Sequence, residues 1–171
     1  MNKTRDESPL KWLNCDVGSL TPYVPGRPIE SVAHEYNLDP ASIIKLASNE
    51  NPLGVPRKAR RAIKEAASEM SFYPDGGASA LRQKLAHKHG LAPEQFVVGS
   101  GSNEIIEFIG HCFMGKDSSI VISSHAFAIY KIIARMFGSE VKEAPTSDYG
   151  HDLRRMADLV DETTSVVFVC N

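Results

Sequence analysis

Short strand-like segments alternate with segments of helical periodicity over the second half of the chain. The strand-like segments lie at 96–98, 119–122, 140–144 and 165–170. Between them, apolar residues recur every three or four positions, as they do on one face of an amphipathic helix. These helical segments begin near residue 102, near residue 129 and at residue 153. The pattern predicts strands and helices in regular alternation.

The first half of the chain is patterned less regularly. Residues 1–20 show no period, and the stretch 21–28 holds three prolines and a glycine, which favours an extended or turning arm. The elements expected after the arm are a short helix at 28–36, a short strand at 43–47, a polar turn at 49–54, a helix at 56–70 and a helix at 78–89 that ends at Gly90.

Strands connected by helices of this length form crossover units, and such units build a mainly parallel sheet with helices on both faces. The chain is therefore assigned to the α/β class. The sequence contains no internal repeat and no low-complexity segment.

Composition and charge narrow the classes of function. The 171 residues are 42% hydrophobic and 23% charged, as in an ordinary globular domain. With a formal net charge of -2 and no long basic run, nucleic-acid binding is not expected. The chain shows neither a secretory signal nor a run approaching the roughly 18 apolar residues of a membrane span, so we expect a cytoplasmic protein without membrane association.

Neither the cysteines nor the histidines suggest a metal site. Cys15, Cys112 and Cys170 are an odd number without paired metal-like spacing, and the last two stand in apolar stretches. We expect reduced, mostly buried thiols. The six histidines form no metal-ligand constellation.

A turn of small residues, Val97-Val-Gly-Ser-Gly-Ser-Asn-Glu104, connects a predicted strand to a predicted helix. Glycines let a backbone approach a ligand closely, and the free N–H groups of a first helical turn favour phosphate. The turn follows a strand end, where open parallel sheets bind ligands, but its spacing matches neither the dinucleotide fingerprint nor the P-loop. It is either a phosphate cradle or a simple turn with Ser102 as the helix cap.

Three aromatic residues occupy positions from which they could act on a ligand. Phe127 stands at the start of a predicted helix, where it either stacks on a flat cofactor ring or belongs to the core. His125 fits a partly exposed structural residue better than a base, because no Ser or Cys partner with an orienting acid is evident. Tyr73 precedes a proline and two glycines, so its hydroxyl can project from what is otherwise only a turn.

Taken in order, six segments resemble fold-type-I, pyridoxal-phosphate-dependent aminotransferases, and most closely histidinol-phosphate aminotransferases. The segments lie between residues 22 and 153, the resemblance as a whole covers residues 22–171, and the joint match of the segments is more specific than any single motif. The segments are Pro22-Tyr-Val-Pro-Gly-Arg-Pro28, Leu46-Ala-Ser-Asn-Glu-Asn-Pro-Leu-Gly54, Tyr73-Pro-Asp-Gly-Gly77 with Leu81-Arg82, Gly99-Ser-Gly-Ser-Asn-Glu104, His125-Ala-Phe-Ala-Ile-Tyr130 and Asp148-Tyr-Gly-His-Asp-Leu153.

The resemblance implies roles for individual residues. Ser102 and Asn103 match the residues that give backbone N–H groups to the phosphate of pyridoxal 5'-phosphate, and Phe127 matches the aromatic ring that stacks on its pyridine ring. Tyr73 matches the tyrosine that reaches the cofactor phosphate of the neighbouring subunit, which implies a homodimer. Such an enzyme transfers the amino group of histidinol phosphate to 2-oxoglutarate, giving imidazole acetol phosphate and glutamate in histidine biosynthesis.

The resemblance also implies a division of the chain. Residues 1–54 correspond to an N-terminal arm and substrate-side segment, in which Tyr23 and Asn49 line the substrate side of the site. Residues 55–171 correspond to an incomplete large domain that binds the cofactor.

The groups that perform the chemistry in the family have no match in this chain. A complete enzyme continues after Val-Cys-Asn with Pro-Asn-Asn-Pro-Thr-Gly and later supplies the Schiff-base lysine. Lys45, Lys116 and Lys131 do not stand in the motif of that lysine. We therefore assign no catalytic residue, and we expect the chain to be an N-terminal part that is inactive alone.

Two alternatives stay open. Threonine-phosphate decarboxylases and aromatic aminotransferases share the fold and much of the pattern, although the 148–152 segment and the Asn49 turn favour the histidinol-phosphate assignment. The other alternative is a non-catalytic remnant that binds a partner chain.

Overall fold

A computed structural model describes residue 18 and residues 20–146 and 148–170 of the chain. The chain forms two compact units. One unit is Val24–Val97, and the other joins the described part of Met1–Tyr23 to that of Val98–Asn171. The sequence predicts a functional division at residue 54, between a substrate-side segment and a cofactor-binding domain. Neither border of the two compact units falls at that residue, and the functional division stays a prediction.

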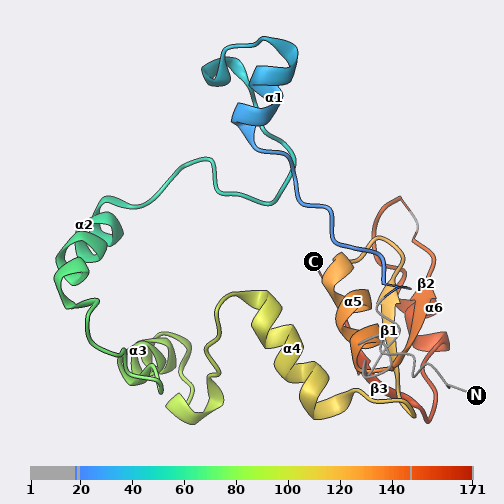
Figure 1. Ribbon diagram of the computed structural model, residues 1–171. Helices are drawn as coiled ribbons and strands as arrows, with labels where there is room; N and C mark the ends of the chain where they lie inside the picture. The colour runs from blue at the N-terminus through green and yellow to red at the C-terminus, as the bar shows by residue number, and fades with distance from the viewer. Residues whose placement is uncertain (1–17, 19, 147, 171) are drawn as a thin grey trace, which may run out of the picture. The chain divides into compact units, whose positions relative to one another are not determined.

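A parallel sheet of three strands forms the centre of the second unit (Figure 1). The strands are β1 (Ser119–Ser123), β2 (Glu140–Ala144) and β3 (Thr164–Val167), and their order is β2-β1-β3. β1 pairs in parallel with both neighbours, Ile120 lying opposite Val141 on one side and Val166 on the other. All five residues of β1 are buried. The predicted parallel sheet is therefore confirmed.

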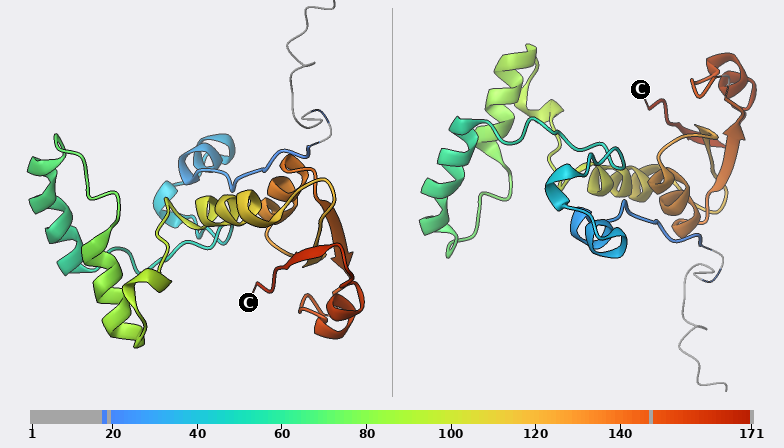
Figure 2. Two further views of the ribbon diagram at one scale, coloured as in Figure 1. Left: turned by 90° about the horizontal axis from the view of Figure 1, so that it is seen from below. Right: turned by 90° about the horizontal axis from the view of Figure 1, so that it is seen from above.

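Helices cover both faces of this sheet, as predicted (Figure 2). Side chains alternate between the two faces of a strand, so Ile120 and Ile122 share one face of β1 and Val121 takes the other. Ala134 of α5 (Ala128–Met136) packs on the first pair. Met156 of α6 (Leu153–Asp158) packs on Val121 and Ala144 on the opposite face.

A third helix of this unit, α4 (Ser102–Phe113), packs against α5. Ile106 of α4 forms a buried cluster with Ile129 and Ile133 of α5. The two helices come close at Gly110, where an added Cβ would lie 2.4 Å from Cε2 of Phe137 and 2.9 Å from Cγ2 of Ile133. A residue without a side chain is thus required at this contact.

The Val24–Val97 unit consists of short helices joined by extended segments. α1 ends at Asn37 and α3 at Gly90, both in the left-handed conformation that commonly terminates helices. The predicted helices of this region are confirmed. Its elements are α1 (Ile29–Tyr36), η3 (Pro40–Ser42), α2 (Arg57–Ala66), η4 (Ala67–Glu69), α3 (Ser79–His89) and η5 (Pro93–Gln95).

Two predicted strands are wrong. Residues 43–47 and 96–98 form no strand, because no other segment of the described chain pairs with them. Without a partner, several of their apolar side chains stay in solvent: Ile44 is 83% exposed and Leu46 90%. The last strand is also shorter than predicted, since β3 ends at Val167 rather than at residue 170.

Candidate functional site

The turn that leads into α4 contains two glycines, Gly99 and Gly101. Gly101 has a φ of +85°, which an ordinary side chain strains to adopt. At Gly99, an added Cβ would lie 2.9 Å from Oε2 of Glu104 and 3.0 Å from Cδ1 of Ile105. Gly101 therefore allows a backbone conformation that other residues strain to adopt, whereas a side chain at Gly99 would displace the ends of the Glu104 and Ile105 side chains.

Ser102 and Asn103 are the first two residues of α4, and both are exposed. The helix cap is Gly101, not Ser102, and no side chain caps the helix by a hydrogen bond. The expectation that Ser102 is the helix cap is therefore wrong, and the phosphate role of the turn stays a prediction. The N–H groups of a first helical turn have no partner within the helix, and they lie at the positive end of its dipole. The turn thus offers donors to an anion.

Glu104 already binds one donor of this turn. Its Oε2 accepts a hydrogen bond from the backbone N–H of Ser100. The carboxylate lies in the first turn of α4, where negative charge is favourable. It holds the Gly99–Gly101 turn against the helix.

Phe127 is the residue before α5 and is half-buried. It packs against the Ile106, Ile129 and Ile133 cluster, which joins it to α4, the helix that begins at Ser102. The ring therefore contacts the core and also stays accessible in part. Its role as a stacking ring remains a prediction.

Tyr23, from the arm, contacts the ring of Phe127 edge-on. The ring centroids are 6.3 Å apart and the ring planes are inclined by 81°. Tyr23, Phe127, Ser102 and Asn103 thus belong to the same unit. Four of the six site residues predicted from the sequence are placed in one compact part of the chain.

His125 lies in the loop after β1 and is exposed. Its Nδ1 is 2.6 Å from Oγ1 of Thr146, which follows β2, and its ring meets that of Tyr149 edge-on at 5.1 Å. The loops after two neighbouring strands are connected through this histidine. This agrees with the expectation of a partly exposed structural residue.

Sequence reasoning missed an aromatic stack beside Phe127. Tyr130 stacks on Phe168 with ring centroids 4.1 Å apart and planes inclined by 11°. Burial, and then the hydrogen bond and charge interaction with Cys170, raise the pKa of Tyr130 to about 12. Nε2 of His151 bonds the backbone carbonyl oxygen of Cys170. Spacing along the sequence could not reveal these contacts, because they join residues about 20 to 40 positions apart.

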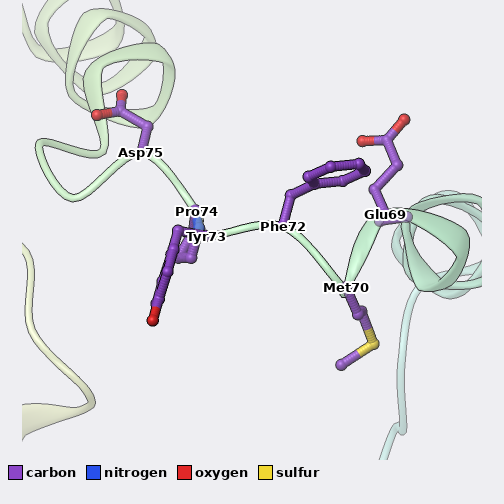
Figure 3. A pocket seen from close by; sticks show the side chains of 7 residues that line it. Glu69, Met70, Phe72, Tyr73, Pro74 and Asp75 are labelled. Atoms are coloured by element: carbon purple, nitrogen blue, oxygen red, sulfur yellow. The ribbon is translucent and has the colours of Figure 1, made fainter.

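Tyr73 belongs to the other unit and is fully exposed. It lines a surface hollow with Met70 and Phe72, and the Tyr73 and Phe72 side chains project from opposite sides of the loop (Figure 3). Asp75 fixes the following turn by accepting hydrogen bonds from the N–H groups of Gly77 at 2.9 Å and Ser79 at 2.7 Å. The Ser79 and Gly77 hydrogen bonds hold the pKa of the Asp75 carboxyl below its usual value.

Asn49 is exposed in the segment between η3 and α2 and also lies in the Val24–Val97 unit. It lines a hollow that Ile43 and Pro52 share, beside an ion pair of Lys45 and Glu50 with 2.8 Å between Nζ and Oε1. The substrate roles of Asn49 and Tyr23 and the cofactor role of Tyr73 stay predictions.

The expectation of mostly buried thiols is wrong for the two cysteines that the structure describes. Cys112 and Cys170 are free and exposed. Cys15 lies outside the described residues. Within the described residues, no group of three or more His, Cys, Asp or Glu side chains could hold a metal ion. No helix in that part of the chain is long and apolar enough to cross a membrane.

Comparison with known proteins gives matches at three levels. The family model of the class I and II aminotransferases matches residues 41–171. Histidinol-phosphate aminotransferase 2 of Pseudomonas fluorescens (strain Pf-5) is 43% identical over 155 residues, which are 91% of this chain and 42% of the relative. The histidinol-phosphate aminotransferase of Halalkalibacterium halodurans is 43% identical over 89% of this chain and 41% of its own length.

Solved structures agree with the fold. A histidinol-phosphate aminotransferase from Sinorhizobium meliloti, in complex with pyridoxal-5'-phosphate, superposes with a TM-score of 0.66 at 22% identity over 82% of this chain and 36% of its own. A Thermus thermophilus aspartate aminotransferase variant superposes with a TM-score of 0.68 at 17% identity over 90% of this chain and 43% of its own. The chain has the fold of part of these enzymes and spans about 42% of the length of its curated relatives.

Proposed function

The chain belongs to the class I and II aminotransferase family, and we propose its function on this basis. Within this family it is the N-terminal part of a histidinol-phosphate aminotransferase, which transfers the amino group of histidinol phosphate to 2-oxoglutarate. The observation that carries the proposal is the 42–45% identity, over 91% of the chain, to several relatives with that name. The same relatives favour this activity over the decarboxylase and aromatic alternatives.

The cofactor of the proposed enzyme is pyridoxal 5'-phosphate, and the turn before α4 fits its phosphate. The first helical turn has no side-chain cap, and Gly99 and Gly101 permit the close backbone geometry. Ser102 and Asn103 would bind the phosphate through their backbone N–H groups. When bound, the cofactor supplies the electron sink that amino-group transfer requires.

Phe127 would orient the pyridine ring by stacking on it. The half-buried position of Phe127 supports this role, because the core holds one part of the residue while another stays accessible. Tyr23, which contacts the edge of Phe127, would lie on the substrate side of the ring. Asn49 is assigned to the substrate side as well.

A homodimer completes the proposed site. In this proposal Tyr73 reaches the cofactor phosphate of the partner subunit. Its full exposure supports that role, because a side chain that serves another subunit must project from its own. The compartment proposed for the enzyme is the cytoplasm.

No lysine of the chain is assigned to catalysis, and we expect the chain alone to be inactive. Lys45 and Lys131 are engaged in ion pairs with Glu50 and Glu143. Incubation of the purified chain with pyridoxal phosphate, histidinol phosphate and 2-oxoglutarate should give no sustained formation of glutamate. Sustained turnover would overturn the assignment of the catalytic groups to residues outside this chain.

Binding of pyridoxal phosphate to the purified chain, followed by its absorbance, tests the site itself. Ser102→Asp places a negative charge at the donors proposed for the phosphate, so we expect affinity to fall about tenfold or more. Ser68→Asp adds the same charge at an exposed position of η4 and should leave the affinity unchanged. Equal binding by both variants, or no binding by the unsubstituted chain, would contradict the proposed cofactor site.

A further inference from the structure

Tyr130, in the first turn of α5, lies between two other aromatic rings. On one side it meets Phe127 edge-on, with ring centroids 5.8 Å apart and planes inclined by 89°. On the other side it stacks on Phe168 at 4.1 Å. Edge-to-face and stacked pairs are the two favourable arrangements of aromatic rings. The three side chains thus form one continuous contact.

Phe168 is fixed to the sheet. Its backbone N–H donates to the carbonyl oxygen of Val121 at 3.0 Å, which extends the pairing of β1 and β3 by one residue. Val121 is completely buried. Tyr130 therefore rests on a ring whose backbone is held by the most buried strand of the unit.

Phe127 packs against the Ile106, Ile129 and Ile133 cluster with one part of its side chain and leaves another part accessible. It precedes α5, and its other aromatic neighbour is Tyr23 from the arm, a residue that is about half exposed. An aromatic side chain with an accessible face can rotate unless its neighbours restrict it. The contact from Tyr130 supplies such a restriction from the side of the sheet.

We propose that Tyr130 is a positioning residue that fixes the orientation of the Phe127 ring for stacking on the cofactor. The inference rests on the proposed function, which assigns the stacking to Phe127. Tyr130 acts through its ring, by linking Phe127 to Phe168, and does not itself touch the cofactor.

The phenol hydroxyl of Tyr130 interacts with Cys170 and not with the two neighbouring rings. Burial and the interaction with Cys170 raise the pKa of Tyr130 to about 12, so the hydroxyl stays protonated at physiological pH. Tyr130→Phe removes this hydroxyl and keeps both ring contacts. Tyr130→Leu removes the ring contacts. The pair of variants therefore separates positioning by the ring from hydrogen bonding.

The test is titration of the purified chain with pyridoxal 5'-phosphate, with two readouts. The readouts are the dissociation constant and the circular dichroism induced in the absorption band of the bound cofactor. Tyr130→Leu should weaken binding by about 3- to 10-fold, as loss of an aromatic pair does, and should diminish the induced signal. Tyr130→Phe should bind within about twofold of the unsubstituted chain and restore the signal. Tyr36→Leu, an exposed tyrosine of α1, is the matched control and should change neither readout.

A second variant covers the case in which Tyr130→Leu does not fold. Phe168→Leu removes the ring on which Tyr130 stacks, so it should weaken the binding of pyridoxal phosphate as Tyr130→Leu does. If the unsubstituted chain binds and all variants bind alike, the inference fails and the proposed function survives. If the unsubstituted chain does not bind pyridoxal phosphate, the proposed function fails and the inference fails with it.

Discussion

Gly110→Ala should destabilise the unit that contains the sheet, although alanine is the better helix former. Gly110 lies in α4 and is buried against α5. The added methyl group would lie 2.4 and 2.7 Å from two ring carbons of Phe137 and 2.9 Å from Cγ2 of Ile133. Atoms this close overlap, so the helices must separate or Phe137 must leave its place.

The expected magnitude follows from two opposed contributions. Replacing glycine by alanine inside a helix stabilises by about 0.5–1 kcal/mol. Forcing a methyl group into a packed contact costs about 1–3 kcal/mol, and three overlaps place this site in the upper part of that range. The ring of Phe137 also contacts His111 edge-on at 4.8 Å, so displacing Phe137 would disturb a second contact. We expect a net loss of about 1–2 kcal/mol.

Urea denaturation followed by far-ultraviolet circular dichroism measures this loss as a lower midpoint at an unchanged slope. Gly115→Ala is the matched control, because its added Cβ would have no neighbour within 4 Å and its φ is ordinary. The control should stay within about 0.5 kcal/mol of the unsubstituted chain. If Gly110→Ala were as stable as Gly115→Ala, the close packing of α4 on α5 would be refuted.

Three further predictions concern single side chains. The first concerns Asp75, whose carboxylate accepts the N–H of Ser79 and has a lowered pKa. The Ser79 amide should therefore stay protected from hydrogen exchange above about pH 4, the usual carboxyl range, and lose this protection only as the pH falls through the lowered pKa. Asp75→Asn should reduce the protection at neutral pH. Lys142→Met should raise the pKa of Asp161, which Lys142 holds low by a 2.6 Å ion pair, as followed by NMR titration; an unmoved pKa would refute this cause. Ser123→Ala should be neutral or stabilising by up to about 1 kcal/mol in the same urea assay, because the buried hydroxyl has no hydrogen-bond partner among the described residues.

The sequence was informative where one segment contains its own signal. The helix that ends at Gly90 carries its terminator within the chain, and the periodic apolar residues of 105–113 predict a helix without knowledge of its partner. The turn before α4 was recognised as a candidate anion site from its glycines and from the helix start, which are both local, although the strand expected before it at 96–98 does not form.

Features that depend on distant partners were not predictable from pattern. Residues 43–47 have the apolar content of a strand, yet a strand exists only if another segment pairs with it, and in the described chain none does. The stack of Tyr130 on Phe168 depends on how β3 pairs with β1, and no spacing within one segment of the sequence encodes that pairing. For the same reason the exposure of Cys112, in an apolar helix segment, could not be inferred from its neighbours in sequence.

The strand order β2-β1-β3 has a consequence for the order of assembly during synthesis. β1 can pair with β2 once residue 144 has left the ribosome, and α5 can then cover one face. The other edge of β1 must wait for residues 164–167. During that interval a fully apolar stretch, Ile120-Val-Ile122, presents an unpaired backbone edge, which is the kind of surface that recruits other nascent chains. The interval between β2 and β3 is therefore the stage at which we expect this chain to depend most on chaperones.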